Sequence, residues 1–225
     1  MEILLITIIV LAIILMIILF IYWRFQSIFS TPSTGKISDG IIAITNSFVS
    51  SFIYTKESDI IMIDTGFSKK GMKSALNELN ISPNEISNVF LTHSDGDHTG
   101  GISLFNSANI YFGKDTKIKN SENFMFLDDS EVVKVGNIKI QSIATPGHRA
   151  GHTSYLIDDK YLFTGDLIRL KDNEAKPFIK IISSDSKKME ESIEKLARIK
   201  GIKMLFTAHT GYTGEFSDAM EKWNN

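Results

Sequence analysis

Two histidines and two aspartates crowd into the segment HSDGDH, residues 93–98. Where a strand gives way to a loop, side chains two residues apart can point the same way, and Gly96 allows unusual backbone dihedrals. Acids and imidazoles packed this closely would repel one another and be poorly solvated without a cation. The segment therefore predicts a site for a divalent metal ion. The candidate ligands are His93, Asp95, Asp97 and His98.

The other three of the five histidines lie in two glycine-containing segments. TPGHRAGH holds His148 and His152, and TAHTG holds His209. Each segment follows an apolar, strand-like run, where loop-borne active-site groups are expected. Asp166 in FTGD and Asp64 in MIDTG also follow such runs. An exposed polar loop would account for HSDGDH alone, but not for histidines and aspartates at the ends of several separate apolar runs.

The elements that must position these residues are short runs rich in Ile, Val, Phe and Tyr, which are typical of strands. We expect strands at residues 40–45, 48–55, 59–63, 89–92, 109–112, 131–135, 138–143, 154–157, 161–164 and 204–207. Ser68 and Asp185 are good helix N-caps followed by apolar residues at helical spacing, and a short last helix is expected at 216–223. Strand groups with helices between them indicate a mixed α and β sandwich.

The N-terminal segment differs from the rest of the chain. Residues 3–23 are apolar apart from Thr7, and at about 1.5 Å per residue a helix of this length spans the roughly 30 Å hydrocarbon core of a bilayer. A cleaved signal peptide would show a basic start and a small-residue cleavage site, and neither is present. We therefore expect a transmembrane anchor. Arg24, which follows the span, orients the rest of the chain toward the cytoplasm by the positive-inside rule.

These features divide the chain into three parts. Residues 1–25 are the expected anchor, 26–38 form a linker rich in Ser, Thr, Pro and Gly, and 39–225 form one folded domain. The net charge of -2 offers no excess of positive charge, so nucleic acid is not an expected partner. Without cysteine, any metal must be held by nitrogen and oxygen ligands. The expected partners are a small-molecule substrate and the membrane.

The ordered motifs resemble the metallo-β-lactamase superfamily over residues 40–212. The resemblance implies a four-layer αββα sandwich of the α/β (α+β) class, with two divalent metal ions at one edge. By the same resemblance, Asp64 orients the site through hydrogen bonds and His152 supports it without ligating. The implied ligands are His93, Asp95 and His148 for the first metal, Asp97, His98 and His209 for the second, and Asp166 as the bridge between them.

One position departs from the usual HxHxDH motif, because Asp95 stands where the second histidine is expected. A glutamate occurs there in the diiron domain of flavo-diiron proteins, and an aspartate in some competence-type nucleases of the superfamily. Zinc is the first expectation for the metal. Iron and manganese are alternatives, since carboxylates suit these ions better than imidazoles do.

The expected reaction is hydrolysis of a small ester, thioester or lactone by hydroxide that the metals generate from water. Asp97 would orient this nucleophile or pass its proton to the leaving group, and Tyr212 would help to stabilise the developing oxyanion. Substrate specificity is expected in residues 111–129 and 167–178, which read as loops. Arg169 and Lys171 in the second loop are candidates for binding an anionic group, or else ordinary surface charges.

Two other functions with the same fold remain open. The first is a diiron-type redox protein resembling the oxidoreductase domain of flavo-diiron proteins, favoured by Asp95 but without room for a flavodoxin domain. The second is a phosphodiesterase or nuclease. Against the second, the chain lacks the large inserted domain of RNA-processing members, and its last motif is HTGY rather than His-His-Gly-Ser. A non-catalytic binding module is disfavoured because no ligand position is lost.

Overall fold

The computed structural model describes residues 2–26, 28–119 and 121–224. By its internal contacts the chain divides into two compact units, Met1–Ser30 and Thr31–Asn225. The first unit contains the helix α1, Glu2–Gln26. Within the described residues, the second contains all the strands and the remaining helices.

The expectation of a transmembrane anchor in α1 is wrong on the structural evidence. Among the described residues, no helix combines the length and the apolar character needed to cross a membrane. The side chains of Ile3, Ile21 and Arg24, on which the predicted span and its orientation relied, lie outside the described ones. The predicted membrane localisation depends on this anchor and is therefore wrong as well.

Seven strands form the first sheet of the second unit, in the order of the sequence. They are β1 Gly35–Ser38, β2 Ile41–Asn46, β3 Val49–Lys56, β4 Asp59–Ile63, β5 Asn88–Phe90, β6 Asn109–Gly113 and β7 Phe124–Leu127. The first four pair antiparallel, and the pairs from β4 to β7 are parallel. The helix α2, Lys69–Glu78, follows β4 and makes the crossover to β5 possible.

Six strands form the second sheet, in the order β15-β14-β11-β10-β9-β8. They are β8 Val132–Val135, β9 Ile138–Ala144, β10 Thr153–Ile157, β11 Tyr161–Phe163, β14 Met204–Thr207 and β15 Gly211–Thr213. Only the β11–β14 pair is parallel among these, and α4, Ser186–Ala197, lies between the two strands in the sequence. A separate hairpin is made of β12, Ile168–Lys171, and β13, Glu174–Pro177.

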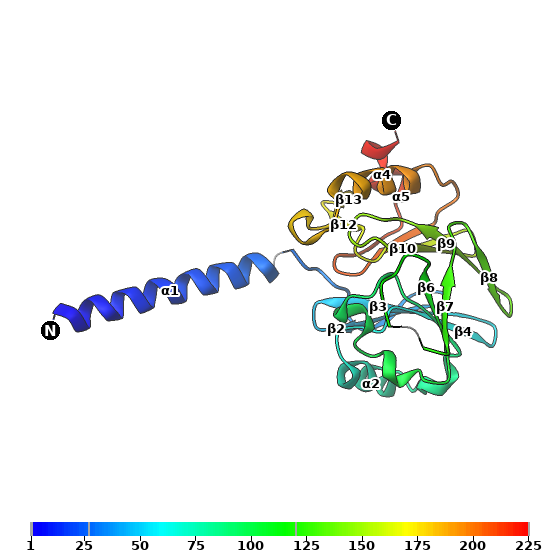
Figure 1. Cartoon of the computed structure of the whole chain (residues 1–225), viewed down its shortest axis with the longest axis horizontal. Coiled ribbons are helices and arrows are strands. Elements are labelled where there is room, and N and C mark those ends of the chain that lie inside the picture. The colour runs from blue at the N-terminus through cyan, green and yellow to red at the C-terminus, as the bar shows by residue number, and fades with distance from the viewer. Residues whose placement is uncertain (1, 27, 120, 225) are drawn as a thin grey trace. The chain divides into compact units, whose positions relative to one another are not determined.

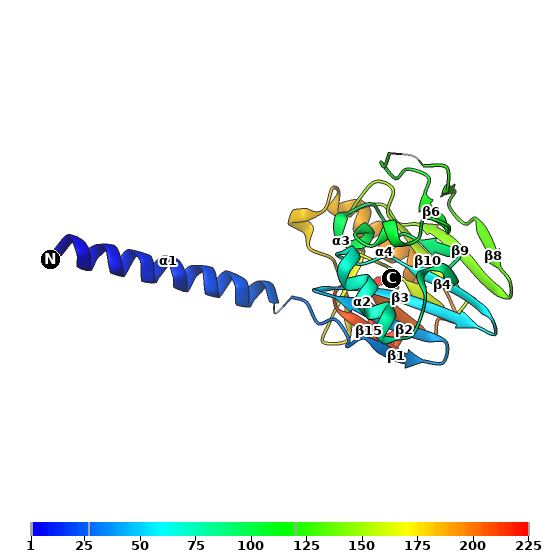
Figure 2. The same ribbon diagram turned by 90° about the horizontal axis from the view of Figure 1, so that it is seen from below.

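The two sheets face each other across an apolar core, with a helix on each outer side (Figure 1). Phe52 of the first sheet lies 5.3 Å from both Phe163 and Phe206 of the second, measured between ring centroids. On the outer side of the first sheet, Met72 and Leu76 of α2 are fully buried, and Figure 2 shows α2 across β2 and β3. The unit is therefore the αββα sandwich that the motifs implied.

Several elements lie where the sequence analysis expected loops or a linker. β1 lies in the expected linker, β7 in the expected loop 111–129, and the β12–β13 hairpin in the expected loop 167–178. The hairpin turns at Asp172 and Asn173, whose φ angles of 53° and 56° are those of a two-residue turn with positive φ. The remaining short elements are α3 Gly96–Thr99, α5 Phe216–Ala219, η1 Pro83–Glu85, η2 Ile102–Leu104, η3 Lys180–Ile182 and η4 Glu221–Trp223.

Candidate metal centre

The acidic and imidazole side chains singled out in the sequence meet at one edge of the sandwich, each carried by a segment that follows a strand. The segment from β5 into α3 supplies the HSDGDH residues, and the segment after β9 supplies His148. Asp166 follows β11, and His209 lies in the tight turn from β14 to β15. Residues separated by more than a hundred positions in the chain thus contribute to one site.

Four of these side chains form a first cluster of potential ligand atoms, all within 4.8 Å of one another. Oδ1 of Asp166 lies 3.2 Å from Nε2 of His98 and 3.0 Å from Nε2 of His209. Oδ2 of Asp97 lies 3.8 Å and 3.5 Å from the same two nitrogens. These are the residues that the superfamily resemblance assigned to the second metal, together with the bridging aspartate.

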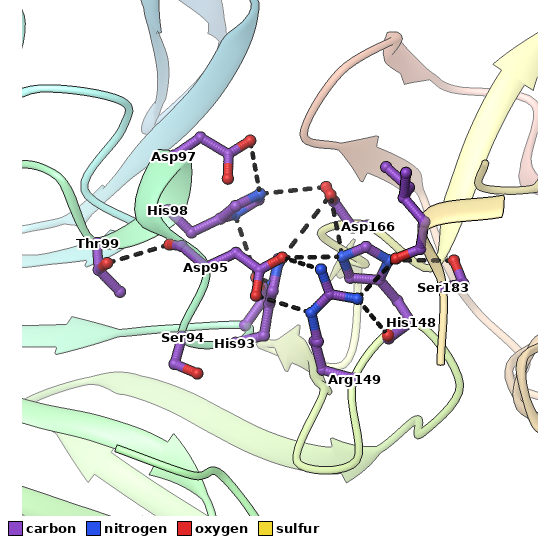
Figure 3. A network of polar contacts seen from close by, with 12 residues as sticks. His93, Ser94, Asp95, Asp97, His98, Thr99, His148, Arg149, Asp166 and Ser183 are labelled. Carbon is purple, nitrogen blue, oxygen red and sulfur yellow. Dashed lines mark hydrogen bonds and ion pairs between the residues drawn. The ribbon is translucent and has the colours of Figure 1, made fainter. Parts of the chain in front are cut away.

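A second cluster uses the other oxygen of Asp166. Oδ2 of Asp166 lies 4.0 Å from Nε2 of His93 and 3.6 Å from Nε2 of His148. The carboxylate of Asp166 thus presents one oxygen to each cluster, and Figure 3 shows its contacts with His98 and His148. Asp95 stands beside this second cluster but is not part of it, although its Oδ2 lies 3.8 Å from Nε2 of His93 and 3.4 Å from Nε2 of His148.

The imidazoles are all oriented in the same sense, because each Nδ1 contacts a nearby oxygen. His98 contacts Asp64 at 2.8 Å, and His93 contacts the hydroxyl of Thr92 at 3.0 Å. His148 contacts the hydroxyl of Ser183 at 3.1 Å, His209 the carbonyl of Phe48 at 2.7 Å, and His152 the hydroxyl of Thr145 at 2.9 Å. For the four candidate ligands His93, His98, His148 and His209, this is the usual arrangement of metal-ligating histidines, with one nitrogen fixed and the other directed to the ion.

The buried atoms at the centre fit a bound cation. Nε2 of His93, His98 and His148 and Oδ1 of Asp166 are buried and make no hydrogen bond within the described chain. Leaving such groups desolvated and unpaired is costly, and a metal ion removes that cost. A tetrahedral ion with ligands at 2.0–2.1 Å separates its ligand atoms by about 3.3 Å, close to the distances within both clusters. The donors are imidazole and carboxylate, which bind zinc, iron and manganese.

Asp64 fixes the segment that carries the HSDGDH residues. Its Oδ1 accepts a hydrogen bond of 2.8 Å from the backbone N–H of Thr92, and its Oδ2 lies 2.8 Å from Nδ1 of His98. The backbone of Asp64 has a φ of 57°, a left-handed conformation that costs free energy in residues other than glycine. Gly165, before Asp166, also has a positive φ, and a Cβ there would lie 2.6 Å from Oγ1 of Thr92. Asp64 and Gly165 therefore serve the geometry of the site.

The charges of the centre depend on one another. Burial alone would raise the pKa of Asp166, but the neighbouring His209 and His98 outweigh burial and hold the pKa well below its usual range. Burial would likewise raise the pKa of Asp95, while contacts with His148 and Arg149 lower it to about 2. Both carboxylates are therefore anionic at neutral pH. Burial, helped by His148, lowers the pKa of His152 to about 3, so His152 is neutral.

Comparison with known proteins identifies the family. Residues 44–111 match the model of the metallo-β-lactamase superfamily. A probable metallo-hydrolase of Methanocaldococcus jannaschii is 34% identical over 156 residues, which cover 67% of this chain and 71% of that protein. The chain belongs to the metallo-β-lactamase superfamily. The resemblance drawn from the motifs is thereby confirmed, and with it the expectation of a metallo-hydrolase that uses divalent metal ions.

Other members of the superfamily match shorter stretches. A hydroxyacylglutathione hydrolase of Dictyostelium discoideum is 36% identical over 95 residues, which cover 37% of this chain and 34% of that enzyme. A probable polyketide biosynthesis zinc-dependent hydrolase of Bacillus subtilis is 31% identical over 147 residues, 62% of this chain and 60% of that protein. This chain thus spans about a third of the first relative and three fifths of the second.

Solved structures of the superfamily share the fold. A B3 metallo-β-lactamase with an active-site glutamic acid has a TM-score of 0.66 at 15% identity, covering 89% of this chain and 91% of that one. An archaeal superfamily protein of Sulfolobus tokodaii has a TM-score of 0.63 at 19% identity, covering 85% of each chain. At such low identities the likeness concerns the fold alone.

A cavity of about 170 Å³ adjoins the metallo-hydrolase centre on the side of His93. Thr116 and Lys117 line it from the segment 111–129, in which substrate specificity was expected, and Ser94 and Arg149 line it from the metal-bearing segments. Arg169 and Lys171 lie on β12 instead, where Nε of Arg169 donates to the carbonyl of Pro177 at 3.2 Å. Their contact with substrate stays a prediction.

Tyr212 is not among the residues that meet at the centre. It lies on β15 with 42% of its surface exposed, and its ring packs 5.9 Å from that of Phe206. Its role in stabilising an oxyanion therefore stays a prediction. The aromatic side chains that do contact the centre are Phe48 and Phe178, whose rings stack at 5.6 Å and 5.1 Å from the imidazole of His209. The sequence does not predict that these two phenylalanines lie beside His209, because neither belongs to a recognisable motif.

Arg149 is the main functional residue that the sequence analysis did not single out. Its guanidinium contacts both oxygens of Asp95 (Figure 3). A signal was present in the sequence, since a cation directly follows His148 while an acid replaces the histidine expected at position 95. The two positions are 54 residues apart, so only the fold shows that they meet.

Proposed function

We propose that this metallo-hydrolase binds two divalent metal ions, zinc first among them, and hydrolyses a small thioester, ester or lactone. The observation that carries the proposal is the position of Asp166. One of its carboxylate oxygens faces His98 and His209, and the other faces His93 and His148. A buried carboxylate shared between two imidazole pairs suits a bridge between two cations.

The metal ions would supply a nucleophile from water at neutral pH and polarise the scissile carbonyl. The protein's part is to orient the reactants. Asp97 is suited to that task because its side chain keeps 21% of its surface exposed, whereas those of His98 and Asp166 are almost fully buried. An exposed carboxylate at the mouth of the centre can accept a hydrogen bond from an incoming water and hold its proton for the leaving group.

The choice of substrate class rests on the motifs and on the relatives. TPGHRAGH and FTGD resemble the corresponding segments of glyoxalase II-like and lactonase-like members. Two relatives are named as a hydroxyacylglutathione hydrolase and a polyketide biosynthesis hydrolase, and the first of these names denotes a thioester substrate. We therefore place thioesters first. The diiron alternative drew its support from the charge of Asp95, and that charge is paired with Arg149.

The experiment that tests the proposal is a substrate panel on the purified full chain loaded with zinc or manganese. Thioesters, aryl esters, lactones and a phosphodiester are compared by kcat/KM, with His98→Ala as the control for contaminating hydrolases. We expect thioester, ester or lactone cleavage that His98→Ala lowers by at least about a hundredfold. Cleavage of the phosphodiester alone, or equal rates for both proteins, would contradict the proposal.

A further inference from the structure

Asp95 and Arg149 form a two-pronged ion pair beside the metal centre. Nε of Arg149 donates to Oδ1 of Asp95 at 2.8 Å, and Nη2 donates to Oδ2 at 2.5 Å (Figure 3). Such fork-to-carboxylate pairs fix the direction of both side chains as well as adding electrostatic attraction. Only 26% of the Asp95 side chain and 35% of the Arg149 side chain are exposed, so the pair is partly shielded from water.

The remaining donors of Arg149 connect the pair to the rest of the site. Nη1 donates to the carbonyl of His148 at 2.8 Å and to the carbonyl of Ile182 at 2.7 Å. Ser183, next to Ile182, contacts Nδ1 of His148 at 3.1 Å. Four of the five N–H donors of Arg149 are thus committed to these partners, which fixes its guanidinium beside the site.

The direction of Asp95 follows from this arrangement. The guanidinium of Arg149 donates to both carboxylate oxygens of Asp95. Oδ2 of Asp95 nevertheless lies 3.4 Å from Nε2 of His148 and 3.8 Å from Nε2 of His93. A carboxylate oxygen has a second lone pair to offer beside the one used by the arginine. Arg149 therefore leaves one oxygen of Asp95 facing the imidazoles and keeps the carboxylate from rotating.

Counting charges shows what the pair does to the centre. Asp95, Asp97 and Asp166 carry three negative charges, where HxHxDH members carry two at the matching positions. The single positive charge of Arg149 offsets one of them, which leaves a net of two negative charges. Asp95 and Arg149 together are therefore as neutral as the histidine that they replace.

We propose that Asp95 and Arg149 act as one neutral unit in place of that histidine, with Arg149 as a positioning residue that directs Oδ2 of Asp95 toward the first metal. The inference rests on the proposed metal-dependent function and adds a specific dependence between two residues. A histidine at 95 would need no partner. An arginine left opposite that histidine would repel the cations.

The test is a double-mutant cycle read out as zinc affinity. Arg149→Met keeps the aliphatic stem and removes the charge and the fork. In the wild-type background it should weaken zinc binding by about 10–100-fold, because Asp95 loses the partner that orients it. In the Asp95→His background the same substitution should strengthen zinc binding on the order of tenfold, because it removes an uncompensated cation beside the metals. The effect of Arg149→Met on zinc affinity is thus expected to have opposite signs in the two backgrounds.

Affinity is measured on metal-stripped protein by competition with a chromophoric chelator. Cobalt absorption spectra report independently on the ligands, and circular dichroism checks the fold. Arg198→Met, an exposed arginine at the C-terminal end of α4, is the control for loss of one positive charge and should change nothing. If Asp95→His does not fold, Asp95→Asn takes its place with the same expected reversal, since asparagine is also neutral.

A loss of zinc affinity by the same factor in both backgrounds would overturn the inference, because it would make Arg149 a general structural support. This outcome is distinct from failure of the proposed function. If the wild-type protein binds no zinc, the proposal of a metal centre is itself contradicted. If the wild-type protein binds zinc but cleaves none of the substrates in the panel, the proposed substrate class is contradicted. The double-mutant cycle of zinc affinities can still be interpreted in that case.

Discussion

Oδ2 of Asp64 lies 2.8 Å from Nδ1 of His98, and the same carboxylate accepts a 2.8 Å hydrogen bond from the backbone N–H of Thr92. One buried side chain thus sets both the start of the metal-bearing segment and the direction of an imidazole within it. Asp64 adopts a left-handed backbone conformation to do so. Such local strain is retained at functional sites because the surrounding structure holds it in place.

Asp64→Asn should therefore weaken zinc binding by about 10–100-fold while leaving the backbone intact, since asparagine tolerates the left-handed conformation well. Asp64→Ala should add a loss of stability, because alanine does not. Chelator competition and urea unfolding of the metal-free proteins separate the two effects. Unchanged zinc affinity in Asp64→Asn would show that the carboxylate has no influence on His98.

His148 and His152 should differ in their effect on metal content. Nε2 of His148 lies 3.6 Å from Oδ2 of Asp166. His152 is buried next to His148, and its Nδ1 contacts the hydroxyl of Thr145. We expect His148→Ala to lose one metal ion per chain, and His152→Ala to retain both but to unfold at lower temperature. Metal analysis by mass spectrometry decides between them. Equal metal loss in the two variants would mean that the ligating and supporting roles are assigned wrongly.

Gly147 allows the segment that carries His148 to lie against α4. Its φ is 144°, and a Cβ there would lie 2.4 Å from the backbone N and Cα of Met189. The carbonyl of Gly147 also accepts a hydrogen bond from Asp185, the N-cap of α4. Gly147→Ala should destabilise the protein by about 1–3 kcal/mol through overpacking and strain.

The matched control is Gly214→Ala, where the Cβ would find only one atom, at 3.9 Å, and the φ is not positive. That substitution should change the free energy of unfolding by less than about 0.5 kcal/mol. Both are measured by urea denaturation without metal. A Gly147→Ala protein as stable as Gly214→Ala would mean that the segment is not held against α4.

Asp158 should make the folded state sensitive to acid. Burial would raise its pKa, but hydrogen bonds from the backbone N–H of Lys139, from Lys56 and from Tyr54 lower the pKa below its ordinary value. A lowered folded-state pKa stabilises the protein above the ordinary pKa of an aspartate, and this contribution is lost as pH falls from about 5 through the folded-state value. Asp158→Asn should cost roughly 1–3 kcal/mol at pH 7, and the deficit should shrink toward pH 3.

Asp159→Asn is the control, because this neighbouring carboxylate forms an exposed ion pair with Lys139 and should contribute less than about 1 kcal/mol. Urea unfolding curves of the metal-free proteins between pH 7 and pH 3 supply the comparison. A deficit of Asp158→Asn that stays constant with pH would show that it does not come from the charge.

The candidate site was predictable from the sequence because each group stands directly after an apolar run. His93, His148, Asp166 and His209 are carried by the segments that follow β5, β9, β11 and β14, so recognising the strands also located the site. The hydroxyls and carbonyls that hold the Nδ1 atoms were not predictable. Ser183 and Phe48 come from distant segments, and only the folded chain places them beside His148 and His209.

Two segments of the chain differ from their predicted structure for physical reasons. The β12–β13 hairpin contains Lys171, Glu174, Lys176 and Pro177, which do not give the alternation of apolar and polar residues expected of strands. Asp172 and Asn173, which form the turn of this hairpin, are the residues in this segment that are typical of a tight turn. The apolar N-terminal segment does form a helix, α1, but apolar composition alone does not establish a membrane span, and the described helix does not provide one.

Two buried imidazole pairs share Asp166, which we propose as the bridge of a two-metal centre. The most direct test is the metal content of the purified full chain and of Asp166→Ala, measured side by side by mass spectrometry after identical zinc loading and desalting. We expect about two zinc ions per wild-type chain and no more than about one in the variant, because neither imidazole pair keeps its shared oxygen. The same ratio in both proteins would contradict it.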